Sequence, residues 1–172
     1  MLCVVAHPDD EVLGCGGTLA KHAEAGDAVS VMILAERDLF HSARQAARIL
    51  MGADVTVAGR KYPDQAFDTV PFKKIVSEIE SYSRVGIVYT HNPDDLNLDH
   101  AITARAVLTA FRAPHSQANI LAFETLSSTE FGPVAFQPNH WETLSSAQVE
   151  KKVAALGCYP TEVQPPPHPR NS

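Results

Sequence analysis

The sequence predicts an α/β fold with a mostly parallel sheet, and two observations carry this prediction. Short apolar runs rich in β-branched residues alternate with amphipathic helical stretches from residue 2 to about residue 126. The connections between these stretches are short, as in layered proteins whose helices cover the faces of a sheet.

The elements follow in order. Apolar runs predict strands over residues 2–6, 27–34, 54–58, 86–90 and 120–123. Helical periodicity predicts a first helix that ends at Gly26, a second over 40–51, a third that starts at Pro71 and runs to 82, and a fourth over 99–110 with Asp99 as its N-cap. Beyond residue 126 the pattern is irregular: one amphipathic helix over about 145–156 precedes a proline-rich stretch that predicts an extended tail.

The winding of these units predicts where a ligand binds. Right-handed crossovers make the first and fourth strands neighbours, at the point where the strand order reverses. Ligands of open α/β sheets bind at that point. The loops that begin at His7 and His91 should therefore face each other across a cleft.

Length and composition exclude several classes. The 172 residues predict a single domain over 1–172, with a core over 1–126 and an irregular part over 127–172. Hydrophobic residues make up 45% and charged residues 20%, which is typical of a folded domain. The net charge of −6, without a basic run, argues against nucleic acid as a partner.

The sequence shows no pattern typical of a secretory signal, a membrane span or a disulfide framework. The start of the sequence is strand-like rather than a secretory signal, and no apolar run approaches the ~20 residues of a membrane span. Three cysteines without a C-x-x-C pair indicate neither a disulfide framework nor a cysteine zinc site. A cytoplasmic location is the expectation.

Acids and histidines concentrate in the two loops that are expected to meet. The first loop holds Asp9, Asp10 and Glu11 in succession, and like charges this close need a cation or several donors. One of the aspartates could act only as a helix N-cap, and His91 is more simply a hydrogen-bonded histidine at a strand end than a metal ligand. The glycines of Gly14-Cys15-Gly16-Gly17 are more typical of close helix packing than of a phosphate site, and Cys15 of packing than of a nucleophile.

The motif Ala6-His7-Pro8-Asp9-Asp10-Glu11, followed by Thr90-His91-Asn92-Pro93 and Asp99-His100, resembles the LmbE-like, or PIG-L, family of zinc-dependent de-N-acetylases. The resemblance extends over residues 1 to about 123. It implies a Rossmann-like three-layer αβα sandwich. Such relatives continue beyond their His-Pro-Arg, which implies that this chain is shortened after His168-Pro169-Arg170.

The resemblance also implies residue roles. His7, Asp10 and His100 would hold Zn²⁺, and Asp9 would be the catalytic base. Independently of the resemblance, Glu11 and Asp99 are suited to orient the ligands by hydrogen bonds. Two histidines and one carboxylate suit a catalytic zinc with an open position, and they also suit Fe²⁺.

One position departs from the family pattern. Asn97 stands where the family usually has a histidine, so its amide could donate to a developing oxyanion but could not deliver a proton. Asp9 would then serve as both base and acid. Arg44 and Asp64 are candidate substrate contacts.

These expectations describe a hydrolase that removes acetyl from an N-acetylated amino sugar or its conjugate. The expected partner is that small molecule, and a homo-oligomer is compatible with the sequence. Two alternatives stay open: a metal-binding sugar-recognition module without turnover, suggested by Asn97, and a nucleotide-binding α/β domain, suggested by the glycines after His7.

Overall fold

The computed structural model describes residues 1–36, 38–52, 56–82, 84–114 and 116–170. Five parallel strands form one sheet in the order β3-β2-β1-β4-β5. They are β1 (Leu2–Val5), β2 (Ser30–Glu36), β3 (Thr56–Pro63), β4 (Ile87–His91) and β5 (Asn119–Phe123). The predicted α/β class is confirmed, and β1 and β4 are the neighbours that the winding predicted.

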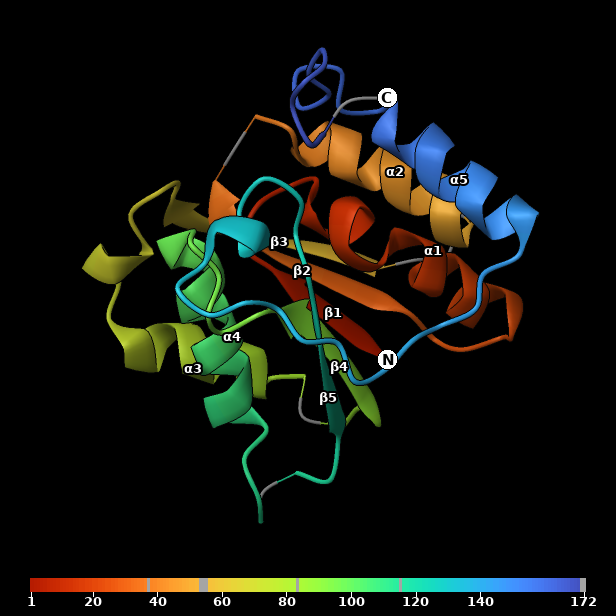
Figure 1. Cartoon of the computed structure of the whole chain (residues 1–172). Helices are drawn as coiled ribbons and strands as arrows, with labels where there is room; N and C mark the ends of the chain where they lie inside the picture. The colour runs from red at the N-terminus through yellow and green to blue at the C-terminus, as the bar shows by residue number, and fades with distance from the viewer. Residues whose placement is uncertain (37, 53–55, 83, 115, 171–172) are drawn as a thin grey trace.

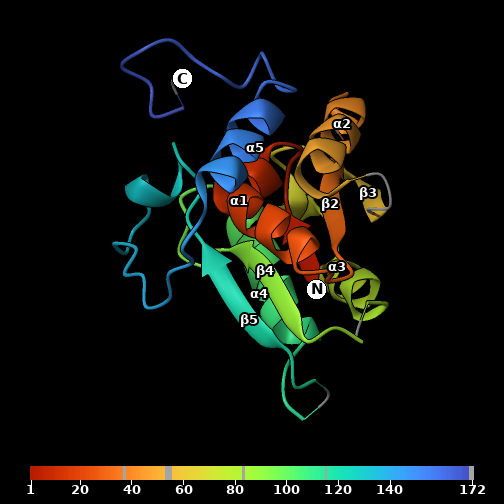
Figure 2. The same ribbon diagram turned by 90° about the vertical axis from the view of Figure 1, so that its right-hand side faces the viewer.

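Helices cover both faces of the sheet, which makes three layers (Figure 1). One face carries α1 (Asp10–Glu24), α2 (Phe40–Met51) and α5 (Ser146–Leu156), and the other carries α3 (Phe72–Glu80) and α4 (Leu98–Ala110). Two 3-10 turns, η1 (Phe67–Thr69) and η2 (Thr129–Phe131), complete the described elements. Figure 2 shows β5 at the edge of the sheet, beside β4.

The central strand shows why the sheet is buried on both sides. Leu2 and Val4 point into a core that α3 and α4 cover, whereas Cys3 and Val5 point into a second core beneath α1, α2 and α5. A strand buried on both faces is a continuous apolar run, as in most parallel sheets. β1 thereby anchors the loop at His7 rigidly.

Several predicted boundaries were wrong. β2 begins at Ser30 instead of residue 27, and β3 continues to Pro63, beyond the expected end at 58; residues 54 and 55 of that expected strand lie outside the described part. Pro71 is the N-cap of α3 rather than its first residue. Asn97, not Asp99, caps α4, because its side-chain oxygen accepts the N–H of Asp99.

The C-terminal stretch differs from its expected extended tail. It folds back in turns in which the N–H of His168 donates to the carbonyl of Pro165 and the N–H of Gln164 donates to the carbonyl of Arg170. Within the described residues, no helix is long and apolar enough to cross a membrane.

Candidate metal centre

The two loops meet at the carboxyl ends of β1 and β4, as predicted. His7 directly follows β1, Asp10 begins α1, and His100 lies in the first turn of α4. All three side chains are almost completely buried. Two imidazoles and a carboxylate therefore form a buried cluster at the point where the strand order of the sheet reverses.

The spacing of three atoms in this cluster suits a tetrahedral metal ion. Nδ1 of His7 lies 3.2 Å from Nε2 of His100, and Oδ2 of Asp10 lies 3.3 Å from each of these nitrogens. Ligand atoms at 2.0–2.2 Å from a tetrahedral zinc lie roughly 3.3–3.6 Å apart. Oδ1 of Asp10 is buried without a hydrogen-bond partner among the described residues, which also fits a bound cation. The residues present fit the metal that the resemblance implies.

The far nitrogen of each ligand histidine contacts carboxylates. Nε2 of His7 lies 3.1 Å from Oδ2 of Asp99 and 3.1 Å from Oδ1 of Asp64. Nδ1 of His100 lies 3.2 Å from Oδ1 of Asp95. Such carboxylates fix the tautomer and the ring orientation of a ligand histidine. Asp99 is itself held, because it accepts the backbone N–H groups of residues 65 and 67.

These contacts decide the charges of the cluster. Burial opposes protonation of His7, but hydrogen bonds to Asp10 and Asp99 outweigh it and raise its pKa to about 10. Burial also opposes protonation of His100, but the charge of Asp10 and its hydrogen bond outweigh burial and raise the pKa of His100 to about 9. Without a metal, these pKa values favour the positively charged, doubly protonated form of both rings at neutral pH. A bound metal would replace the protons on the two nitrogens that face Asp10.

His91 behaves differently, although it stacks on His100 with ring centroids 3.9 Å apart. The backbone N–H of Ala6 donates to Nε2 of His91, and Nδ1 of His91 lies 3.2 Å from Oγ1 of Thr125. Burial and the neighbouring His100 lower the pKa of His91 to about 4. These contacts agree with the interpretation of His91 as a hydrogen-bonded histidine at a strand end.

Asp9, the candidate base, lies beside the ligands in a strained backbone conformation, with φ of 116°. Such a φ is unfavourable for any residue other than glycine. Its N–H donates to Oε2 of Glu11, and Nη1 of Arg170 donates to its Oδ2 at 2.8 Å. Burial and the adjacent Asp10 raise the pKa of Asp9 above its ordinary value, while Arg170 opposes the rise.

Glu11 contacts the backbone of Asp9, the candidate base, and its role in orienting a metal ligand by hydrogen bonds stays a prediction. Besides accepting the N–H of Asp9, it accepts the hydroxyl of Tyr159 at 2.6 Å. Burial raises the pKa of Glu11 to about 7, although the hydrogen bond from Tyr159 acts in the opposite direction.

The remaining predicted residues lie in different surroundings. Asn97 caps α4 and is half-buried. Asp64 has a side chain 34% exposed and contacts His7. Arg44 is exposed on α2, with its guanidinium 6.0 Å from the ring centroid of Phe40. It is not among the residues that the structure brings together around His7.

Four residues that support the cluster were missed in the sequence: Asp95, Ser128, Tyr159 and Arg170. Asp95 stands inside the second acidic loop, so its position was the available signal. Tyr159 and Arg170 lie far along the chain, in a stretch without periodicity. Only the three-dimensional structure brings them to the first loop.

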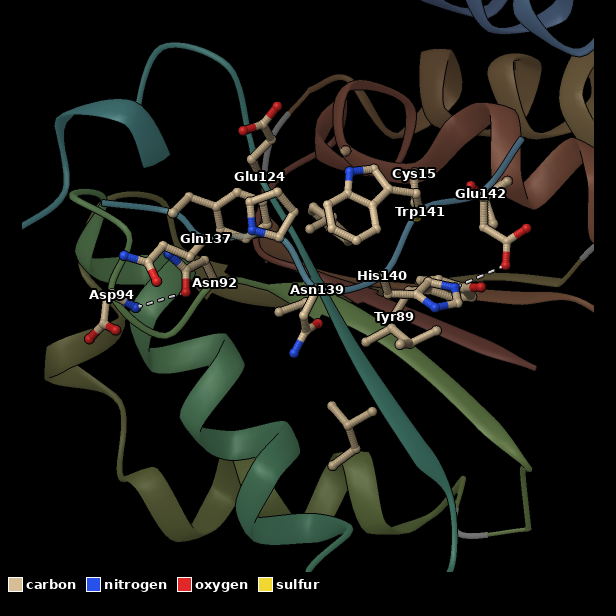
Figure 3. Close-up of a pocket in the computed structure, with 18 of the residues that line it drawn as sticks. Cys15, Tyr89, Asn92, Asp94, Glu124, Gln137, Asn139, His140, Trp141 and Glu142 are labelled. Atoms are coloured by element: carbon tan, nitrogen blue, oxygen red, sulfur yellow. Dashed lines mark hydrogen bonds and ion pairs between the residues drawn. The ribbon is translucent and has the colours of Figure 1, made fainter. Parts of the chain in front are cut away.

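A groove of about 790 Å³ lies along β5 and under residues 134–142 (Figure 3), and its lining residues do not include His7, Asp9, Asp10 or His100. Its lining includes Asn92 and Asp94 from the loop after β4 and Trp141, whose surface is 74% exposed. Amide side chains of Gln137 and Asn139 also line it. The groove therefore combines an aromatic face with hydrogen-bonding groups.

The fold is a three-layer α/β sandwich with a His-Asp-His cluster, able to hold a metal, at the carboxyl edge of its sheet. The chain belongs to the PIG-L family, described as GlcNAc-PI de-N-acetylase, whose model matches residues 2–111. This confirms the family indicated by the Ala6-His7-Pro8-Asp9-Asp10-Glu11 motif.

Three known proteins illustrate the similarity. The uncharacterized deacetylase YaiS of Escherichia coli K12 is 28% identical over 170 residues, which cover 91% of this chain and 88% of that protein. The N,N'-diacetylchitobiose deacetylase of Pyrococcus horikoshii has the same fold, with a TM-score of 0.68, 18% identity and coverage of 95% of this chain and 70% of that one. GalB of Pseudomonas putida, a 4-carboxy-2-hydroxymuconate hydratase, has a TM-score of 0.65, 25% identity and coverage of 92% and 77%.

Proposed function

We propose that this protein is a zinc-dependent deacetylase that removes the acetyl group from an N-acetylated amino sugar or its conjugate. One observation carries the proposal: three ligand atoms at tetrahedral spacing adjoin a buried carboxylate, Asp9, that is not needed as a ligand. The deacetylase relatives support it.

In this proposal His7, Asp10 and His100 hold the metal. When bound, the zinc would polarise the amide carbonyl and make a water acidic enough to lose a proton near neutral pH. Asp9 accepts the proton of the attacking water and returns it to the leaving amine, so it acts as base and then as acid. The raised pKa of Asp9 favours the first of these steps, because a more basic carboxylate accepts a proton more readily.

The substrate contacts are part of the same proposal. The amide of Asn97 would donate to the developing oxyanion, and Asp64 and Arg44 stay candidate contacts for sugar hydroxyls. Fe²⁺ would suit the same ligands. We place the reaction in the cytoplasm, because Cys3, Cys15 and Cys158 carry free thiols.

Four variants test the assignment of ligands and base. His7→Ala, Asp10→Ala and His100→Ala should each lose bound zinc, whereas Asp9→Asn should keep it. Asp9→Asn should also lower the release of free amine from N-acetylglucosamine or N,N'-diacetylchitobiose by about 10²- to 10⁴-fold. Metal content by mass spectrometry and amine release by a fluorogenic reagent are the measurements.

The outcomes separate the alternatives. Full zinc with no amine from any N-acetylated sugar would refute the deacetylase and favour a sugar-recognition module. Loss of zinc from Asp9→Asn would instead contradict the division between ligands and base.

A second candidate reaction is hydration of an unsaturated hydroxy acid, which GalB favours because it shares both fold and 25% identity with this chain. Addition of water to a carbon–carbon double bond also needs an activated water and an acid–base residue. Loss of ultraviolet absorbance from 4-carboxy-2-hydroxymuconate, without amine release from any sugar, would favour the hydratase.

A further inference from the structure

The acidic run Asp9-Asp10-Glu11 finds a different partner for each of its members. Asp10 faces His7 and His100, Glu11 accepts the hydroxyl of Tyr159, and Asp9 pairs with Arg170. The partners of Asp9 and Glu11 come from residues 159–170, beyond the stretch of 2–111 that matches the family. The last part of the described chain is therefore built into the candidate site.

Arg170 is held more firmly than a surface arginine. Its Nε donates to the carbonyl of Leu126 at 3.2 Å, and its Nη1 also lies 3.5 Å from Oε2 of Glu162. Its backbone N–H donates to Nδ1 of His168. The side chain is only 15% exposed. A guanidinium fixed by several acceptors presents its donors in one direction, which suits it to orient a carboxylate.

The contact with Asp9 assigns the two carboxylate oxygens to different tasks. Nη1 of Arg170 donates a hydrogen bond to Oδ2 of Asp9 at 2.8 Å. Oδ1 of Asp9 is then the oxygen that can exchange a proton with water or amine. The backbone of Asp9 is already constrained, because its carbonyl accepts the N–H groups of Val12 and Leu13 and its N–H donates to Glu11. With backbone and one oxygen fixed, the rotation of the side chain is fixed too.

We propose that Arg170 is the positioning residue of the base: it holds the Asp9 carboxylate in the orientation that proton transfer requires and offsets its charge beside Asp10 and Glu11. This inference rests on the proposed function of Asp9. It differs from a merely structural role, in which Arg170 would only fasten the end of the chain to Leu126 and Glu162.

Kinetics of Arg170→Ala and Arg170→Lys test the inference. We expect Arg170→Ala to lower kcat by about 10- to 100-fold with little change in KM, because a misplaced base affects proton transfer more than substrate binding. Arg170→Lys should recover part of this loss, and added guanidinium ion should partly restore Arg170→Ala. Zinc content should stay at the wild-type level in both variants.

Arg112→Ala is the matched control. Arg112 is also an arginine paired with a carboxylate, Glu80, but it is exposed beyond the C-terminal end of α4, whereas His100 lies in the first turn of that helix. Its replacement should leave kcat and KM unchanged. Equal kcat for Arg170→Ala and Arg112→Ala would overturn the inference, as would a loss that neither lysine nor guanidinium restores.

A second measurement keeps the inference testable apart from activity. In a double-mutant cycle, Arg170→Ala and Asp9→Asn should lower the melting temperature by less together than the sum of their separate effects. Additive effects would overturn the pairing even if the wild type is active. A wild-type protein that releases no amine but shows coupling would refute the proposed function and leave the pairing established.

Discussion

Three histidines lie near Oδ2 of Asp10, but their pKa values shift in different directions because burial and further neighbours differ. His7 and His100 each face carboxylates on both sides, so their pKa values rise to about 10 and about 9. His91 instead accepts a backbone N–H at Nε2, and burial keeps it neutral. Residue type alone does not predict which way the pKa of a buried histidine shifts; the partners of its nitrogens and its burial do.

The metal-free protein should lose stability as the pH rises. A group with a raised pKa in the folded state contributes stability below its unfolded pKa of about 6.5 and loses it as the pH passes its folded value. For His7 and His100 this window extends from about 6.5 to about 10. Zinc should bind more tightly over the same range, because it needs the unprotonated rings.

Urea unfolding of metal-free and zinc-loaded protein at pH 7 and pH 9.5 measures this effect. The free energy of unfolding should fall with pH in the metal-free form, and the gap to the zinc-loaded form should widen. His100→Asn should weaken the dependence of the metal-free form. A gap that narrows at high pH would contradict the assigned charges.

At the scale of the elements, the packing of α1 depends on its glycines. A Cβ at Gly14 would overlap the ring of Phe123, which itself lies edge-on to His91. A Cβ at Gly16 would meet Val12 at an ordinary 3.4 Å. This agrees with the interpretation of these glycines as helix packing, and it places Phe123 between Gly14 of α1 and His91.

The two glycines should respond oppositely to alanine. Gly14→Ala should cost about 1–3 kcal/mol, because Phe123 must move within a packed core. Gly16→Ala should leave stability unchanged or raise it by up to about 1 kcal/mol, because alanine is the better helix former. Denaturant unfolding compares them, and equal effects would contradict the described contact with Phe123.

The N-terminus of α4 gives Asn97 two separable roles. Asn97→Ala should cost about 0.5–2 kcal/mol through loss of the cap, whereas Asn97→Ser should keep it. If the amide also donates to the oxyanion, as proposed, Asn97→Ser should melt like the wild type yet release amine about 10²-fold more slowly. Wild-type activity in Asn97→Ser would leave Asn97 with the capping role alone.

At the scale of the whole molecule, local pattern predicted more of the fold than of the site. Strand order followed from periodicity and handedness, and the first loop stood out because its acids are consecutive. The extent of β3 and the cap of α4 were missed, because boundaries depend on single hydrogen bonds. Tyr159 and Arg170 were missed because their partners are remote in sequence and follow no period.

The distance in sequence between Asp9 and Arg170 matters during synthesis, because residues emerge from the ribosome in chain order. His7, Asp10 and His100 all exist once the chain has reached residue 100, but Arg170 follows Asp9 by 161 residues. At about 5–20 residues per second, the arginine emerges roughly 8–32 s after its aspartate. If His7, Asp10 and His100 bind the metal as proposed, the growing chain holds all three ligands well before it holds the arginine that pairs with Asp9.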